Sequence, residues 1–265
     1  MNTEVKMRVG AVPNPHFAFL GLGSCFVQNL EPHLKQWEKP YLYNPFGTSF
    51  NPISIAHQLR ALLTGDWQPQ YAQHQQVYHD LAAANRFQHH SQQTLVEETV
   101  KALNLSRTYI DTHGKINLII SFGTAHAWYY QGAVVNNCHK IPGELFQRKL
   151  LKLNEMVEEW LAVLELVPDS WNIIFTVSPV KYTRIGLEEN FLGKSLLRML
   201  VEALLDHHTG AVYFPSYEII TDELRDYRFW NTQGTHPTEE AVEVVMERFK
   251  PFLSLAGNPE LNSKF

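Results

Sequence analysis

The hydrophobic positions of the chain gather into five short runs that predict β-strands. Three of these runs show little polar alternation, which is typical of parallel strands covered by helices on both faces. Such strands belong to a fold in which the sheet is the middle layer. The runs span residues 17–22, 41–43, 116–122, 172–177 and 211–214.

Segments with a helical spacing of apolar residues alternate with these strands. This alternation predicts a doubly wound α/β fold: one three-layer αβα domain, residues 1–265, around a parallel sheet of about five strands in flavodoxin-like order. Asn51 before Pro52 is a helix-start signal, and residues 235–239 repeat it. The helical segments span 27–37, 52–63, 146–166, 188–207 and 237–255.

Residues 65–106 form a less regular segment between the second and third predicted strands. The segment is rich in Gln and His, and it also contains aromatic residues such as Trp67, Tyr78 and Phe87. An insertion of this length is expected to have a role of its own. We expect either a lid over the site, lined by these aromatics, or a subunit contact, so a homo-oligomer remains open.

The charge balance argues against two classes of partner. The chain has 22 basic and 27 acidic residues and a formal net charge of -5, without a long run of either sign. We therefore expect no nucleic-acid partner and no anionic membrane surface. A small-molecule or saccharide ester fits this composition better than a polyanion does.

Cysteine and histidine usage predicts neither disulfides nor a metal site. Cys25 and Cys138 are too few for a disulfide scaffold, and the thirteen histidines lack a zinc-ligand spacing. Residues 1–15 lack the apolar core of a secretory signal, and no run is long enough to span a membrane. The cytoplasm is the simplest expected compartment.

Polar and small residues follow each predicted strand, where α/β sheets bind ligands. Ser24 follows the first run and precedes a helical segment, so backbone N–H groups and the helix dipole can stabilise an oxyanion beside it. His236 stands just before the last helical segment. We therefore predict that Ser24 and His236 meet in space.

The tetrad Gly23-Ser24-Cys25-Phe26 resembles the motif that names the GSCFA-domain family, which is similar to the SGNH (GDSL-like) hydrolases. The resemblance implies acyl-ester hydrolysis without a cofactor on a flavodoxin-like fold. It further implies that Ser24 is the nucleophile, that His236 is the base and that Gly47 donates its backbone N–H to the oxyanion. Other segments that resemble family blocks span 44–52, 123–125, 137–142, 178–180, 213–218 and 224–229.

The first departure from the hydrolase pattern lies three residues before His236. Gln233 occupies the place of the usual aspartate, and an amide cannot supply the negative charge that stabilises an imidazolium. Loss of that charge in a serine triad costs about four orders of magnitude in turnover. Either activity is weak, or Asp226, Asp222 or Glu218 orients the histidine from another direction, or the reaction differs.

The second departure is the missing asparagine of the third block, where the chain has Gly123-Thr124-Ala125-His126. Loss of one oxyanion donor costs about 3–4 kcal/mol of barrier. We expect the Thr124 hydroxyl to replace the asparagine, ahead of an amide from Asn44, Asn136 or Asn137.

Three alternatives remain open. Cys25 could be the nucleophile in place of Ser24. The charged segment 225–228 is either a salt-bridge network or a grip on a substrate carboxylate or sugar. Because of the two departures, the chain could also be a non-enzymatic protein that binds carbohydrate or peptidoglycan fragments.

Overall fold

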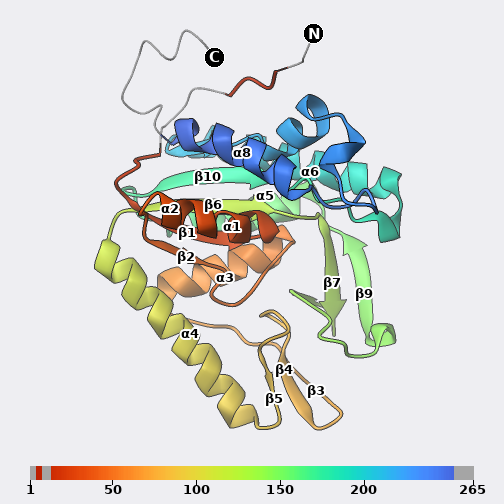
Figure 1. Ribbon diagram of the computed structural model, residues 1–265. Helices are drawn as coiled ribbons and strands as arrows, with labels where there is room; N and C mark the ends of the chain where they lie inside the picture. The colour runs from red at the N-terminus through yellow and green to blue at the C-terminus, as the bar shows by residue number, and fades with distance from the viewer. Residues whose placement is uncertain (1–3, 8–12, 254–265) are drawn as a thin grey trace.

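A computed structural model describes residues 4–7 and 13–253. Its centre is a sheet in which every pair of neighbouring strands is parallel. The strand order β11-β10-β6-β1-β2 is the flavodoxin-like order when the five strands are numbered along the chain. The carboxyl ends of β1, β6 and β10 point toward one edge (Figure 1). The strands are β1 (Ala18–Gly23), β2 (Tyr41–Tyr43), β6 (Ile116–Phe122), β10 (Asn172–Val177) and β11 (Ala211–Tyr213).

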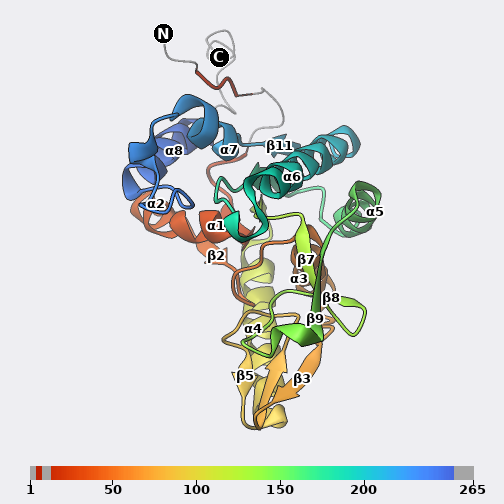
Figure 2. The ribbon, with the colours of Figure 1, turned by 90° about the vertical axis from the view of Figure 1, so that its right-hand side faces the viewer.

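Helices cover both faces of this sheet, which confirms the predicted three-layer αβα fold. Phe19, Ile119 and Ile174 pack into a core with α1, α2 and α8, whereas Leu20 and Ile120 pack on the opposite face against α3, α5 and α6. Figure 2 shows the two groups of helices on opposite sides. The helices are α1 (Cys25–Asn29), α2 (Glu31–Gln36), α3 (Pro52–Thr64), α5 (Leu153–Leu164), α6 (Leu187–His207) and α8 (Glu239–Phe252).

Side-chain caps set the start of two helices. Asn51 Oδ1 accepts a hydrogen bond from Ser54 N at 2.9 Å, with Pro52 as the first helical residue, so that predicted start is confirmed. The last helix begins at Glu239 and is capped by Thr238, two residues after the predicted start at Pro237. Its predicted end at residue 255 lies outside the described residues.

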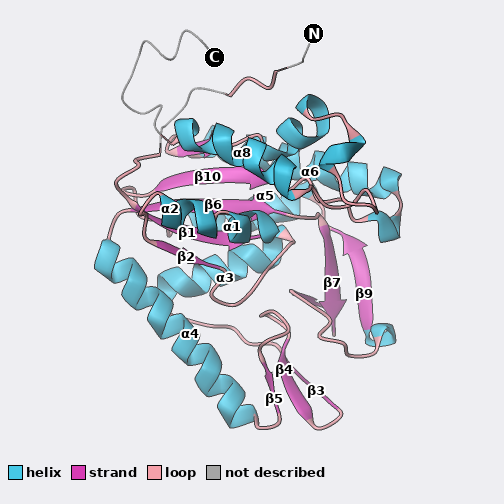
Figure 3. Ribbon diagram, in the orientation of Figure 1, coloured by secondary structure: helices cyan, strands magenta, loops and turns pink. Residues whose placement is uncertain are grey.

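A second, antiparallel sheet leaves the carboxyl edge directly after β6 (Figure 3). It corrects the predicted helix 146–166, because residues 146–150 pair with β7 and the helix begins only at Leu153. Its strands are β7 (His126–Tyr130), β8 (Ala133–Val135) and β9 (Phe146–Leu150), with the 3-10 turn η1 (Gly143–Leu145) before β9.

The segment 65–106 is more regular than the sequence indicates. It forms three antiparallel strands and the first part of a long helix that continues beyond residue 106. Trp67 stacks on Phe46 with ring centres 4.0 Å apart, and Phe87 is buried nearby. These aromatics thus belong to the core. The elements are β3 (Tyr71–His74), β4 (Val77–Asp80), β5 (Gln88–His89) and α4 (Gln92–His113).

Short helical turns complete the carboxyl edge after β10 and β11. They are η2 (Thr183–Ile185), α7 (Ser216–Glu218), the π-helical turn η3 (Ile219–Glu223) and η4 (Tyr227–Phe229). Across the described part of the chain, no helix combines the length and apolar character needed to cross a membrane.

Candidate functional site

Ser24 lies at the predicted junction, between the end of β1 and the first residue of α1. Its hydroxyl caps the helix by accepting from Phe26 N at 3.3 Å, and it lies 2.7 Å from the Ser121 hydroxyl on β6. Only 1% of the residue is exposed. The candidate nucleophile is therefore in its expected place, but its hydroxyl is buried and hydrogen-bonded.

A tight backbone approach at Gly23 fixes that junction. Gly23 has a φ of 127°, and a Cβ there would lie 2.1 Å from the Ser121 carbonyl oxygen, so only glycine fits. The Asn44 side chain accepts from Gly23 N at 2.8 Å and donates to Gly23 O at 3.1 Å. The strand end before Ser24 is thus held from two sides.

His236 is exposed and precedes α8, as the sequence predicts. Its Nδ1 lies 3.0 Å from Thr235 Oγ1, and its backbone N–H donates to Asn231 Oδ1 at 3.3 Å. None of the hydrogen bonds among the described residues joins His236 to Ser24. The predicted dyad is therefore not formed as a direct contact.

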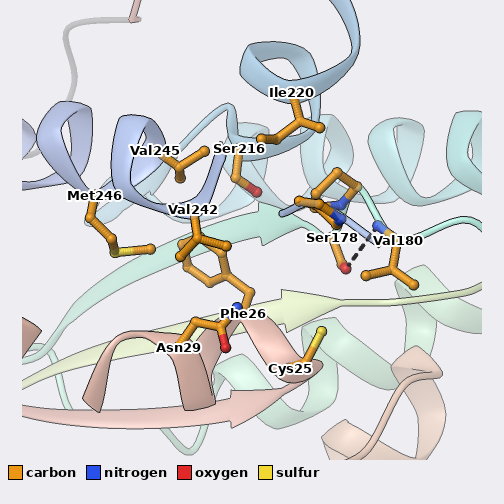
Figure 4. Close-up of a pocket in the computed structure, with 12 residues that line it drawn as sticks. Cys25, Phe26, Asn29, Ser178, Val180, Ser216, Ile220, Val242, Val245 and Met246 are labelled. Carbon is orange, nitrogen blue, oxygen red and sulfur yellow. Dashed lines mark hydrogen bonds between the residues drawn. The ribbon is translucent and has the colours of Figure 1, made fainter. Parts of the chain in front are cut away.

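The segments that carry Ser24 and His236 nevertheless meet. Cys25 and Pro237, which directly follow the two residues, line one crevice of about 30 Å³. Figure 4 shows the Cys25 sulfur pointing toward the turn from Ser178 to Val180. Ser178 and Val180 line the crevice and also a larger cavity beside it.

The larger cavity has a volume of about 340 Å³ and lies at the carboxyl edge of the sheet. It brings together Thr124 and His236, two of the predicted site residues. Its floor comes from the ends of β6 and β10, and one wall comes from the β7–β9 sheet that the sequence analysis missed. The lining residues are Phe50, Asn51, Gly123, Thr124, His126, Trp128, Asn136, Asn137, Arg148, Ser178, Val180, Lys181, Tyr182 and His236.

The expected backbone donors to an oxyanion already have partners. Ser24 N donates to Ser121 O at 3.0 Å, and Gly47 N donates to Asn44 O at 2.7 Å within a turn. The φ of 81° at Gly47 suits that turn, and a Cβ there would collide with Ala84. Both amides are therefore used in holding loops together.

Side-chain donors are better placed. Thr124 Oγ1 accepts from His126 N at 3.1 Å, which leaves its own proton free to point at a ligand. Among the candidate amides, the nitrogens of Asn44 and Asn136 donate to the carbonyls of Gly23 and Thr48. Asn137 lines the cavity, and within the described part of the chain its side chain bonds through its oxygen, which accepts from His139 N.

The carboxylates proposed to orient His236 are engaged elsewhere. Asp226 Oδ1 accepts from Arg228 N at 2.9 Å, and Asp222 lies 3.8 Å from Arg225. Glu218 pairs with Arg198 at 3.0 Å, as a structural carboxylate would. The segment 225–228 is thus an exposed salt-bridge network that does not line the cavity. Gln233 is exposed.

The lid expected from residues 65–106 does not cover this site. None of the described residues lining the crevice or the larger cavity comes from that segment. Instead, the segment supports the loop that follows β2. Ala84 N donates to Phe46 O, and Arg86 donates to Pro45 O. The β7–β9 sheet takes the place at the carboxyl edge that we expected for the insertion.

The Cys25 thiol is a weak nucleophile in this setting. Burial raises its pKa, and the nearby Lys194 ammonium lowers it only in part. Burial also raises the pKa of Cys138, to about 11. A protonated thiol does not attack an ester efficiently, which favours Ser24 over Cys25.

Lys194 is a buried site residue that the sequence analysis missed. From α6 its Nζ donates to Gly123 O at 2.6 Å and to Ser178 O at 2.5 Å, so it joins two loops that line the cavity. A sequence signal existed, because Lys194, Leu197 and Val201 are spaced i, i+3 and i+7 on the buried face of the helix.

Lys194→Met should remove a pH dependence of stability. Burial lowers the pKa of Lys194 to about 7, whereas an unfolded lysine titrates near pH 10.4. Between these values the unfolded chain binds more protons, so the wild-type free energy of unfolding rises with pH. Denaturant titrations at pH 7 and 9 should show wild type gaining about 1 kcal/mol per pH unit over Lys194→Met. The exposed Lys152→Met is the control, and parallel behaviour of all three proteins would contradict this expectation.

The fold and the site together define a flavodoxin-like α/β protein with a cavity at the carboxyl edge of its sheet. The GSCFA family model matches residues 18–249, so the chain belongs to the GSCFA family. A comparison with curated proteins finds no significant match.

One similar solved structure is described provisionally as a platelet activating factor from Streptococcus pneumonia. It is 12% identical, with a TM-score of 0.44, over 93% of this chain and 86% of that chain. A likeness at this level says nothing about the activity of this chain.

Proposed function

We propose that this protein hydrolyses acyl esters of small molecules or saccharides through an acyl-enzyme on Ser24, with His236 as the base. The observation that carries the proposal is the meeting of the two segments: Cys25 and Pro237 share a crevice that adjoins the cavity containing His236. Membership of the GSCFA family, with its resemblance to SGNH hydrolases, supports the same chemistry. No cofactor takes part in it.

The first step requires the Ser24 hydroxyl to leave Ser121 and turn toward the cavity. A neutral hydrogen bond of this kind contributes only about 1 kcal/mol, and catalytic contacts are often long before substrate binds. Ser24 Oγ then attacks the ester carbonyl while His236 accepts its proton. The imidazolium returns the proton to the leaving alcohol, and water then cleaves the acyl-enzyme.

Thr124 is the proposed donor to the oxyanion, with the Asn137 amide as a second candidate. Both line the cavity and have donor capacity that their hydrogen bonds do not use. For Gly47 to donate as the family resemblance implies, its turn with Asn44 would have to open.

The hydrogen-bond partner of His236 is an uncharged group. Nδ1 faces the Thr235 hydroxyl, which carries no charge to stabilise an imidazolium. Gln233→Asp should therefore raise kcat on short acyl esters by at least about tenfold, a small part of the effect of the missing charge. Gln233→Asn is the matched control without charge. Equal activity of both variants would show that the histidine does not work through a carboxylate at this position.

A binding protein on the same scaffold is the second candidate. The observation in its favour is that Ser24 is 1% exposed and its hydroxyl is hydrogen-bonded. A panel of acetyl to octanoyl esters separates the two functions. Hydrolysis by wild type or by Gln233→Asp supports the enzyme, whereas no hydrolysis by either protein favours the binding function.

A further inference from the structure

We propose that the larger cavity contains an anion-binding subsite, so that its ligand carries a carboxylate or phosphate group. The subsite lies between Arg148 on β9, Lys181 after β10 and the rings of Trp128 and Tyr182. This inference adds a substrate class to the proposed function. It rests on that function in one respect, because it takes the bound ligand to be the ester substrate.

Arg148 lies beside two aromatic rings and has no carboxylate partner among the described residues. Its Cζ lies 5.7 Å from the ring centre of Trp128 and 5.8 Å from that of Tyr182. Trp128 is its cross-strand neighbour, and Asn190 Oδ1 accepts from Tyr182 N at 2.9 Å. No ion pair of Arg148 occurs among the described residues. The guanidinium of Arg148, which is an exposed residue, is therefore available for a carboxylate or phosphate.

Lys181 adds a second cation. Its Nζ lies 3.8 Å from the ring centre of Trp230, and its backbone N–H donates to Thr235 O at 2.9 Å, next to His236. It too has no ion pair among the residues that the structure describes. A second cationic residue thus lines the cavity beside the segment that carries the proposed base.

The lining as a whole is electropositive. Among the described lining residues, Arg148 and Lys181 carry positive charge and none is an aspartate or glutamate, whereas burial lowers the pKa of His126. Glu189 Oε2 lies 3.4 Å from His126 Nε2, and the Glu189 side chain is 53% exposed. A cavity lined by charges of one sign concentrates ligands of the opposite sign.

The cavity also limits the size of the ligand. A volume of about 340 Å³ is at the small end for ligand sites, and two aromatic rings offer flat apolar surfaces. An anionic group on an aromatic or sugar ring fits both the charge and the space. The proposed substrate is accordingly an acyl ester whose acid or alcohol part is negatively charged.

Isothermal titration calorimetry with benzoate, phenyl phosphate and neutral benzamide tests the subsite without turnover. Wild type should bind at least one of the two anions at least tenfold more tightly than benzamide, and the comparison of the anions identifies the preferred group. Arg148→Gln should weaken that binding about tenfold and leave benzamide unchanged. Lys149→Gln is the matched control, because Lys149 is the next residue on β9 and packs over Tyr129 on the other face of the sheet.

Equal affinity for the anions and benzamide, no binding of any probe, or no effect of Arg148→Gln would overturn the inference. If Arg148→Gln does not fold, Lys181→Gln replaces it as the test variant. No effect of Lys181→Gln on anion binding would then overturn the inference. Turnover of 4-acetoxybenzoate and 4-acetoxybenzamide separates this failure from failure of the proposed function. Anion binding without hydrolysis of either ester would refute the esterase alone, whereas hydrolysis without anion binding would refute the subsite alone.

Discussion

Ser24→Ala should lower kcat on short acyl esters by at least about 10⁴-fold, because the hydroxyl forms the covalent bond to the acyl group. The matched control is Ser121→Ala, which removes the same 2.7 Å hydrogen bond but keeps the nucleophile. Its kcat should equal or exceed that of wild type, since Ser24 would no longer have to leave a partner. Rates of p-nitrophenyl acetate and octanoate hydrolysis provide the measurement.

Losses of similar size in the two serine variants would contradict this expectation. They would show that the two hydroxyls stabilise the fold and that Ser24 does not attack the ester. Loss of the helix cap that Ser24 provides costs about 1 kcal/mol of stability. Circular dichroism of both variants checks that the sheet and helices persist. Cys25→Ala, which keeps both serines, should retain wild-type turnover.

His236→Ala should reduce kcat about 10³-fold, within the range usual for loss of a general base. The effect should appear in kcat more than in KM, because the histidine acts on the proton of the attacking hydroxyl. Added imidazole should restore part of the rate. His90→Ala, on the distant segment 65–106, is the control, and a loss no larger than in this control would remove His236 from the mechanism.

The core strands could be predicted because their signal is local. Residues 116–122 and 172–177 are strands with the predicted boundaries, since a continuous apolar run buried on both faces is a property of the run itself. The strand order follows from the alternation with helices. Only the position of β6 beside β1, on the opposite side from β2, had to come from the flavodoxin-like pattern.

The β7–β9 sheet could not be predicted in the same way. Residues 146–150 have apolar positions that suit either a strand or the start of the following helix. Their pairing with β7, about twenty residues earlier, decides for the strand, and pairing partners are not encoded by local periodicity. The wall of the cavity, with Arg148, was therefore missed.

The candidate site shows the same division between local and distant information. The position of Ser24 at a strand end, and its role as a helix cap, follow from neighbouring residues. Its hydroxyl partner Ser121 is 97 residues away, and the carbonyl partners of Lys194 lie on two other strand ends. Contacts of this range depend on the register between strands, which the sequence pattern leaves open.

The most direct test of the proposed mechanism is to identify the residue that a fluorophosphonate probe modifies. The folded protein is labelled and then digested, and its peptides are analysed by mass spectrometry. We predict one adduct, on Ser24, that is absent in Ser24→Ala and retained in Cys25→Ala and Ser121→Ala. An adduct on Cys25 or on another serine, or no adduct under conditions in which esters are hydrolysed, would contradict it.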